Sequence, residues 1–212
     1  MKVLLLGLLG LLPAVTAAAA PCTVFKGQRV WLPGGAMGAA TVTVTGDRVT
    51  AVRPGISATN WGCEVVEVGD GVLTPGFIEA STHLGLTEVS LEAASVDHGA
   101  GGTVGKHPVR ASFRVSPAYN PRSSLIPIAR LGGITTALTL PTGGRISGQS
   151  AWIDLVAPGT PGADPVDAST HLRLGGGEGS RAEALWDLQL LLAESRTWAE
   201  QRKAWSRNSF QV

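Results

Sequence analysis

The chain has 212 residues, enough for one large domain or two small ones, and 44% of them are apolar while only 16% are charged. This balance excludes a disordered chain and predicts a packed globular protein. The net charge is +1 and the basic residues form no run, so nothing indicates a nucleic-acid partner. The 28 glycines indicate many tight turns, as in an α/β protein with long connections.

Residues 1–20 have the pattern of a secretory signal peptide. Lys2 precedes an apolar run over residues 3–12, and the segment ends in a run of alanines that suits a cleavage site. Cys22 would also suit a lipoprotein, but Pro21 directly before it fits a lipid-attachment box poorly. The chain is therefore expected to be exported, periplasmic or secreted. No later segment has the ~20 apolar residues that span a membrane.

Cys22 and Cys63 are the two cysteines of the chain. An oxidising compartment permits a disulfide between them, and a pair of buried free thiols is the alternative. The disulfide is the interpretation that export favours. Closing a loop of this length stabilises the fold by on the order of 4 kcal/mol in the chain-entropy model.

Residues 21–72 predict a small β-layer. Threonine and valine alternate over residues 41–45, which is the period of a half-buried strand, and Gly46-Asp47 follows as a turn. Residues 49–52 continue as the return strand of a hairpin. Residues 64–68 form another short strand. A sheet of this size needs a second layer to bury its apolar face.

The next part of the chain predicts a βαβ unit, the repeat of a parallel sheet or barrel. An apolar strand covers residues 71–80. Residues 87–118 form a long loop rich in glycine and proline, a kind of segment that is usually functional or disordered. Asn120-Pro121 favours the start of a helix that runs to residue 131 and kinks at Pro127. Residues 134–140 are a buried strand.

The C-terminal part predicts a strand over residues 151–156, a linker over residues 158–167 and a long helix that reaches residue 205. Ser180 and Glu183 have the spacing of a capping box at the start of this helix. One helix face is apolar and is expected to be packing surface; it carries Leu185, Leu188 and Leu192, widened by Trp186, Leu190 and Ala193.

The segment Leu73-Thr74-Pro75-Gly76-Phe77-Ile78-Glu79-Ala80-Ser81-Thr82-His83 resembles the first barrel strand of the metal-dependent amidohydrolase superfamily. The family pattern there is P-G-[FL]-I-D-x-H-x-H, in which both histidines bind the metal. His83 occupies the second histidine position, and Ser81 occupies the first. Residues 133–137 and 143–149 resemble the next strand and glycine-rich turn of imidazolonepropionase-like amidohydrolases.

The resemblance implies an α/β fold, with part of a (β/α)8 TIM-type barrel over residues 73–212 and a small β-sandwich layer over residues 21–72. It implies a hydrolase for C–N bonds other than peptide bonds, which acts on an amide or cyclic amide with water activated by a divalent metal. Zn²⁺ is the expected ion, His83 the expected ligand and a small molecule the expected substrate.

The length of the chain qualifies this expectation. Eight βα units need at least ~200 residues by themselves and only about two are visible in this sequence, so the other ligands of the family are expected beyond Val212. A barrel cut after two or three strands leaves unpaired strand edges, which predicts that the isolated chain forms homo-oligomers or dissolves poorly.

Ser81 departs from the family pattern, because a neutral hydroxyl is a weak ligand for Zn²⁺. The alternative hypothesis is therefore a non-catalytic, degenerate or truncated amidohydrolase-like exported protein that binds a ligand. His83 is then an ordinary hydrogen-bonded histidine. Three other groups are candidates, each with a structural or solvated role as its alternative: Ser81 as a nucleophile beside His83, Glu79 with Glu88 as an acid–base pair, and Asp97-His98 as donors to a metal or substrate.

Overall fold

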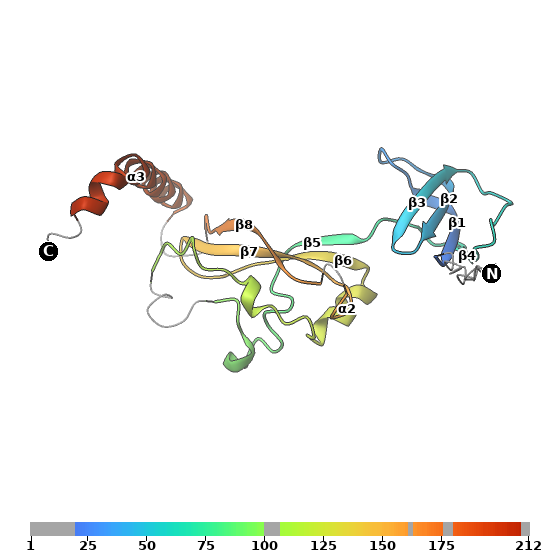
Figure 1. The fold of residues 1–212 in the computed structure, drawn as a ribbon, viewed down its shortest axis with the longest axis horizontal. Coiled ribbons are helices and arrows are strands. Elements are labelled where there is room, and N and C mark those ends of the chain that lie inside the picture. The colour runs from blue at the N-terminus through green and yellow to red at the C-terminus, as the bar shows by residue number, and fades with distance from the viewer. Residues whose placement is uncertain (1–19, 100–106, 161–162, 176–179, 209–212) are drawn as a thin grey trace, which may run out of the picture. The chain divides into compact units, whose positions relative to one another are not determined.

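The computed structural model describes residues 20–99, 107–160, 163–175 and 180–208, and the chain divides into two compact units between Pro75 and Gly76 (Figure 1). Each unit contains one four-stranded sheet. The expected signal peptide lies outside the described residues, apart from its last residue. No helix within the described ranges is long and apolar enough to cross a membrane.

The sheet of the first unit has the strand order β3-β2-β1-β4. Its strands are β1 (Cys22–Trp31), β2 (Met37–Thr45), β3 (Arg48–Pro54) and β4 (Glu64–Glu67). The predicted hairpin is confirmed, since β2 and β3 pair antiparallel through a turn at Gly46, which has φ of +60°. β1 lies antiparallel to β2 and parallel to β4, and β4 is the edge strand on that side of the sheet.

One face of this sheet carries an apolar groove of about 460 Å³. Val30, Ala40 and Val42 are buried beneath it, and Leu73 packs against them. The groove nevertheless leaves apolar side chains in solvent, because Val49 is 62% exposed. Residues 20–75 thus form one sheet with an open face, and the second layer of a sandwich is not found among them.

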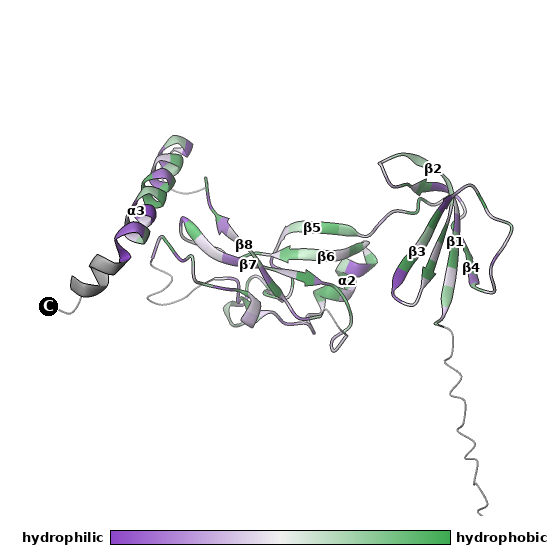
Figure 2. Cartoon of the chain, turned by 45° about the horizontal axis from the view of Figure 1, so that its top comes forward, coloured by the Kyte–Doolittle hydropathy of each residue, from purple (hydrophilic) through white to green (hydrophobic). Residues whose placement is uncertain are grey.

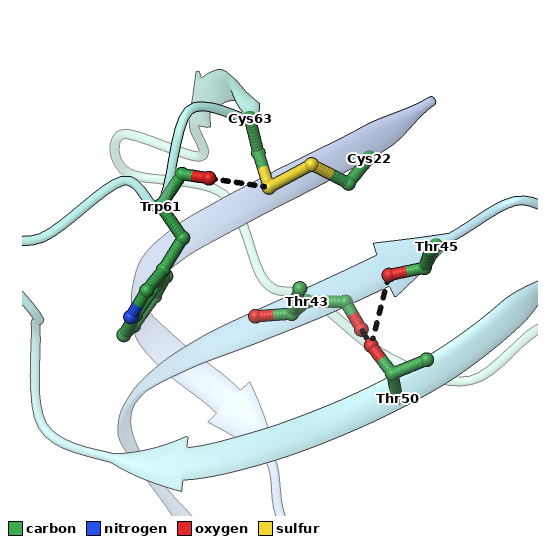
Figure 3. The surroundings of a disulfide bond; sticks show 6 residues. All are labelled: Cys22, Thr43, Thr45, Thr50, Trp61 and Cys63. Carbon is green, nitrogen blue, oxygen red and sulfur yellow. Dashed lines mark hydrogen bonds between the residues drawn. A yellow bond between two sulfur atoms is a disulfide. The ribbon is translucent and has the colours of Figure 1, made fainter. Parts of the chain in front are cut away.

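A disulfide joins the ends of the two parallel strands of this sheet (Figure 3). Cys22 begins β1 and Cys63 directly precedes β4, with their Cα atoms 4.9 Å apart. Thr23 pairs with Glu64 at the next position of the register, so the bridge continues the strand pairing outward. Both cysteines of the chain are used in this bridge.

The sheet of the second unit has the order β5-β6-β7-β8. β5 (Phe77–Thr82) and β6 (Ile134–Thr139) are parallel and are joined through α2 (Leu125–Leu131), so the predicted βαβ unit is confirmed. β7 (Ile146–Asp154) and β8 (Val166–Leu172) then pair antiparallel with their predecessors. The described residues therefore show a mixed sheet and no barrel.

The short connection after β6 explains why the barrel pattern stops. Residues 140–145 separate β6 from β7, whereas a parallel crossover needs a dozen or more residues and usually a helix. A turn of this length can only return the chain antiparallel. β7 also begins earlier than the predicted strand over residues 151–156, and β8 begins inside the predicted linker.

The predicted helix start at Asn120-Pro121 is wrong, because α2 begins at Leu125. The Asn120 side chain instead accepts a hydrogen bond from the Arg122 N–H and forms a turn before the helix. Pro127 therefore falls in the first helical turn, where its missing N–H leaves no bond unmade. Ile126 is the buried residue of α2, and it packs with Ala137, Ile153 and Leu155 in the core of this unit.

The last helix, α3 (Arg181–Asn208), begins with the predicted capping box. The Glu183 N–H donates to the Ser180 hydroxyl at 3.1 Å, and the Ser180 N–H donates to the Glu183 carboxylate at 3.3 Å. Figure 2 shows hydrophobic and hydrophilic residues interleaved along this helix. Ala184 is buried, but Leu185 and Leu192 are 49% and 45% exposed, so most of the predicted packing face is open here.

Candidate functional site

His83 directly follows β5, at the carboxyl end of the one parallel strand pair in the described part of the second unit. Thr82 pairs with Thr139, the last residue of β6, and the Leu140 N–H donates to the Thr82 carbonyl at 2.9 Å. The two strands therefore end together, and His83 lies at their shared end. This is the edge at which α/β sheets place their ligand sites.

The long loop after His83 folds back and brings a second histidine to it. Thr87 and Val96 form an antiparallel bridge, and the Asp97 N–H donates to the Leu86 carbonyl at 2.7 Å. This closure places the His98 ring on the His83 ring, with centroids 4.0 Å apart and planes 23° from parallel. Residues 87–98, the first part of the loop predicted to be functional or disordered, are thus held at the strand end.

Thr142, in the turn between β6 and β7, holds His98 in place. Its hydroxyl is hydrogen-bonded to Nδ1 of His98 at 2.7 Å, and its N–H donates to the His98 carbonyl at 2.9 Å. The carbonyl of Thr142 in turn accepts a hydrogen bond of 2.7 Å from the Arg110 guanidinium. Thr142 therefore connects an imidazole and a buried cation that come from separate parts of the loop.

A third histidine acts electrostatically on His83. Partial burial lowers the pKa of His83 below its ordinary value of 6.5, and the charges of His98 and His171 lower it further. His171 reaches the region from β8, where it pairs with Gly148 of β7. We call His83, His98 and His171 the histidine cluster.

The sequence predicted parts of this cluster and missed others. His83 was recognised by its motif, and Asp97-His98 by its place in the long loop. His171 and Arg110 were missed, because no spacing or motif in the sequence connects them to a strand end. Only the pairing of β7 with β8 and the closure of the loop bring them near it.

Ser81, Glu79 and Glu88 do not form the catalytic groups that the sequence analysis considered. Ser81 is exposed, and its N–H donates to the Glu79 carboxylate at 3.0 Å. Within the described residues the Ser81 hydroxyl forms no hydrogen bond, so the structure gives it no base. Glu88 instead holds the segment before α2, and hydrogen bonds from Ser123 and then Ser124 lower its pKa. No contact joins the two carboxylates as an acid–base pair.

The fit of a metal ion can be judged from the arrangement of the side chains. Among the described residues, no group of three His, Cys, Asp or Glu side chains is placed to hold a metal. An imidazole binds a metal through a nitrogen lone pair in the plane of its ring. Since the His83 and His98 rings are stacked, their lone pairs do not converge on one point. These residues therefore do not form a metal site by themselves.

One of three comparisons with known proteins finds a similar fold over most of the chain. No family model and no curated protein matches the chain. Its fold is similar to that of an amidohydrolase from Thermotoga maritima MSB8, with a TM-score of 0.67 and 18% identity over 88% of this chain. The match covers 51% of that protein, so the chain spans about half its length. The fold is therefore amidohydrolase-like.

A second solved structure, a prolidase complexed with N-methylphosphonate-L-proline, matches a much smaller part of the chain. Its TM-score is 0.27 at 25% identity, over 33% of this chain and 17% of that one. A similarity at this level carries no argument about fold or function.

Proposed function

We propose that the chain is part of an amidohydrolase-type hydrolase that acts on C–N bonds other than peptide bonds, in an amide or cyclic amide. The observation that supports this proposal is the position of His83. It lies at the carboxyl end of the parallel β5–α2–β6 unit, in a fold that resembles an amidohydrolase over 88% of the chain. Active sites of such α/β folds lie at the carboxyl ends of the strands.

In this proposal the histidine cluster positions the substrate at the strand end. In this class of reaction a divalent metal, with Zn²⁺ the expected ion, activates the attacking water. Because the histidine cluster does not converge on one point, metal ligands other than these residues are required, and we assign no step to a metal held here. His98, fixed by Thr142, offers a hydrogen-bonding nitrogen at the strand end.

Metal analysis and an activity assay test the proposal. The 212-residue chain by itself is expected to be inactive, because its described residues do not form a metal site. The protein that contains it, with any sequence beyond Val212, is therefore measured for bound Zn²⁺, and a panel of cyclic amides is tested before chelation, after chelation and after Zn²⁺ is returned. We expect hydrolysis that disappears on chelation, and a His83→Ala variant at least 100-fold lower in kcat/KM, a loss on the scale of one transition-state contact. His107→Ala, at an exposed histidine of the same unit, is the matched control.

A non-catalytic exported binding protein is the second candidate, and Ser81 is the observation that favours it. The residue that should be the first metal ligand is an exposed serine with no partner for its hydroxyl among the described residues. Under this hypothesis the same amides raise the melting temperature of the chain but are recovered unchanged. Hydrolysis with turnover rejects this candidate, and binding without turnover rejects the first.

We also propose that the chain is exported. The disulfide supports this proposal, because such bridges persist in oxidising compartments and are rare in reducing ones. Mass spectrometry of protein from the periplasm and the medium should find a mature chain that begins near Pro21. A chain that retains residues 1–20 and stays with the reduced cytosolic fraction would contradict export.

A further inference from the structure

Arg110 is a buried cation that has no counterion among the described residues. The residue is only 5% exposed, and within the described ranges its guanidinium donates one hydrogen bond, from Nη2 to the Thr142 carbonyl. Nε is buried and has no partner, and no carboxylate in the described part of the chain lies within ion-pair distance. An unpaired buried charge normally costs several kcal/mol. The fold therefore maintains an unfavourable group at this position.

The turn beside Arg110 is shaped around its guanidinium. Gly143 and Gly144 have φ of +83° and +68°, a region that side chains disfavour. A Cβ atom at Gly143 would lie 2.4 Å from Nη2 of Arg110, and one at Gly144 would lie 3.1 Å from Nε. The two glycines thus leave the space that the guanidinium occupies. A side chain at either position would displace it, so the position of Arg110 depends on the sequence of this turn.

The described surroundings of Arg110 add further hydrogen-bonding groups, and none of their carboxylates forms an ion pair with it. Thr142 bonds to Arg110 through its carbonyl and to His98 through its hydroxyl, so the two residues share one neighbour. His83 is stacked on His98, and His171 lies in electrostatic range of His83. Asp97 is the acid nearest in sequence, but it is exposed and forms no ion pair within the described residues.

We propose that Arg110 and the histidine cluster form an oxyanion site that takes the carboxylate or phosphate group of a small molecule. The guanidinium fork suits both groups, because it donates two parallel N–H bonds to two oxygens. An anion here would give Arg110 the counterion that the described residues do not supply. The inference deepens the proposed function, since it names the ligand class of the same site, but binding itself requires no turnover.

NMR of the histidine rings in the full chain tests the proposal. Each ring gives its own signal, assigned with single His→Gln variants, and the chain is titrated with inorganic phosphate and, separately, with acetate. Sodium chloride at matched ionic strength is the reference. We expect saturable shifts of the His83 and His98 signals at roughly millimolar anion, with the exposed His107 unmoved. Stronger binding of phosphate assigns a phosphorylated ligand, and stronger binding of acetate assigns a carboxylate.

Two variants show whether Arg110 is responsible. Arg110→Met should weaken anion binding at least tenfold, while Arg130→Met, at an exposed arginine of α2, should not change it. If Arg110→Met does not fold, Thr142→Val serves instead, because it keeps the guanidinium and removes the hydroxyl that orients His98. Equal shifts of all four histidines, no saturation, or unchanged binding in Arg110→Met or its substitute Thr142→Val would overturn the proposal. Anion binding without amide hydrolysis would reject the proposed hydrolase activity and would support the anion site.

Discussion

Removal of the disulfide should lower the stability of the first unit by a calculable amount. Cys22 and Cys63 are separated by 41 positions, and the chain-entropy model assigns about 4 kcal/mol to closing a loop of that size. Thr23 and Glu64 still pair next to the bridge when it is absent. The loss therefore comes mainly from the unfolded chain, which regains freedom, and the native sheet should survive in the double variant Cys22→Ala, Cys63→Ala.

Urea unfolding, monitored by hydrogen exchange and mass spectrometry, measures the loss of stability separately for residues 20–75. With a slope of about 1–2 kcal/mol per molar urea for a small domain, the midpoint of this unit should fall by about 2–4 M. The wild-type chain with its disulfide reduced is the matched control, and it should unfold like the double variant. A loss below about 1 kcal/mol, or a reduced chain that remains as stable as the oxidised one, would refute the entropic reasoning.

Three further predictions follow from local geometry. Gly85→Ala should cost about 2–4 kcal/mol in thermal unfolding, because φ is +76° and the new Cβ would lie 2.3 Å from the Tyr119 ring; Gly175→Ala, with open space, should be neutral. Ser180→Ala should cost about 1 kcal/mol and fray α3 by circular dichroism, since it removes the N-cap acceptor. The lowered pKa of His83 means that the unfolded chain binds the proton more readily, so stability should fall as the pH drops below 6.5, and His83→Gln should flatten this slope. A slope unchanged in that variant would assign the pH dependence to other groups.

Local patterns in the sequence predicted the elements whose contacts lie close along the chain. Residues 41–52 form the expected hairpin, because alternating apolar residues and a turn at Gly46 specify it together. The capping box at Ser180 formed as predicted, because its two hydrogen bonds span three residues. The strand before His83 was recognised for the same reason, since its apolar run and its motif are contiguous, but the predicted bounds of 71–80 were wrong, because β5 covers Phe77–Thr82.

Tertiary structure decided the rest of the site, because the groups involved meet across long stretches of chain. The closure of the loop at Thr87 and Val96 places His98 on His83, and neither residue carries a signal for that pairing. Thr142 joins Arg110 to His98 through two different atoms of one residue. The short turn after β6 reverses the chain and ends the parallel pattern. Sequence periodicity reports which face of an element is apolar, whereas contacts between distant polar side chains depend on the path of the whole backbone.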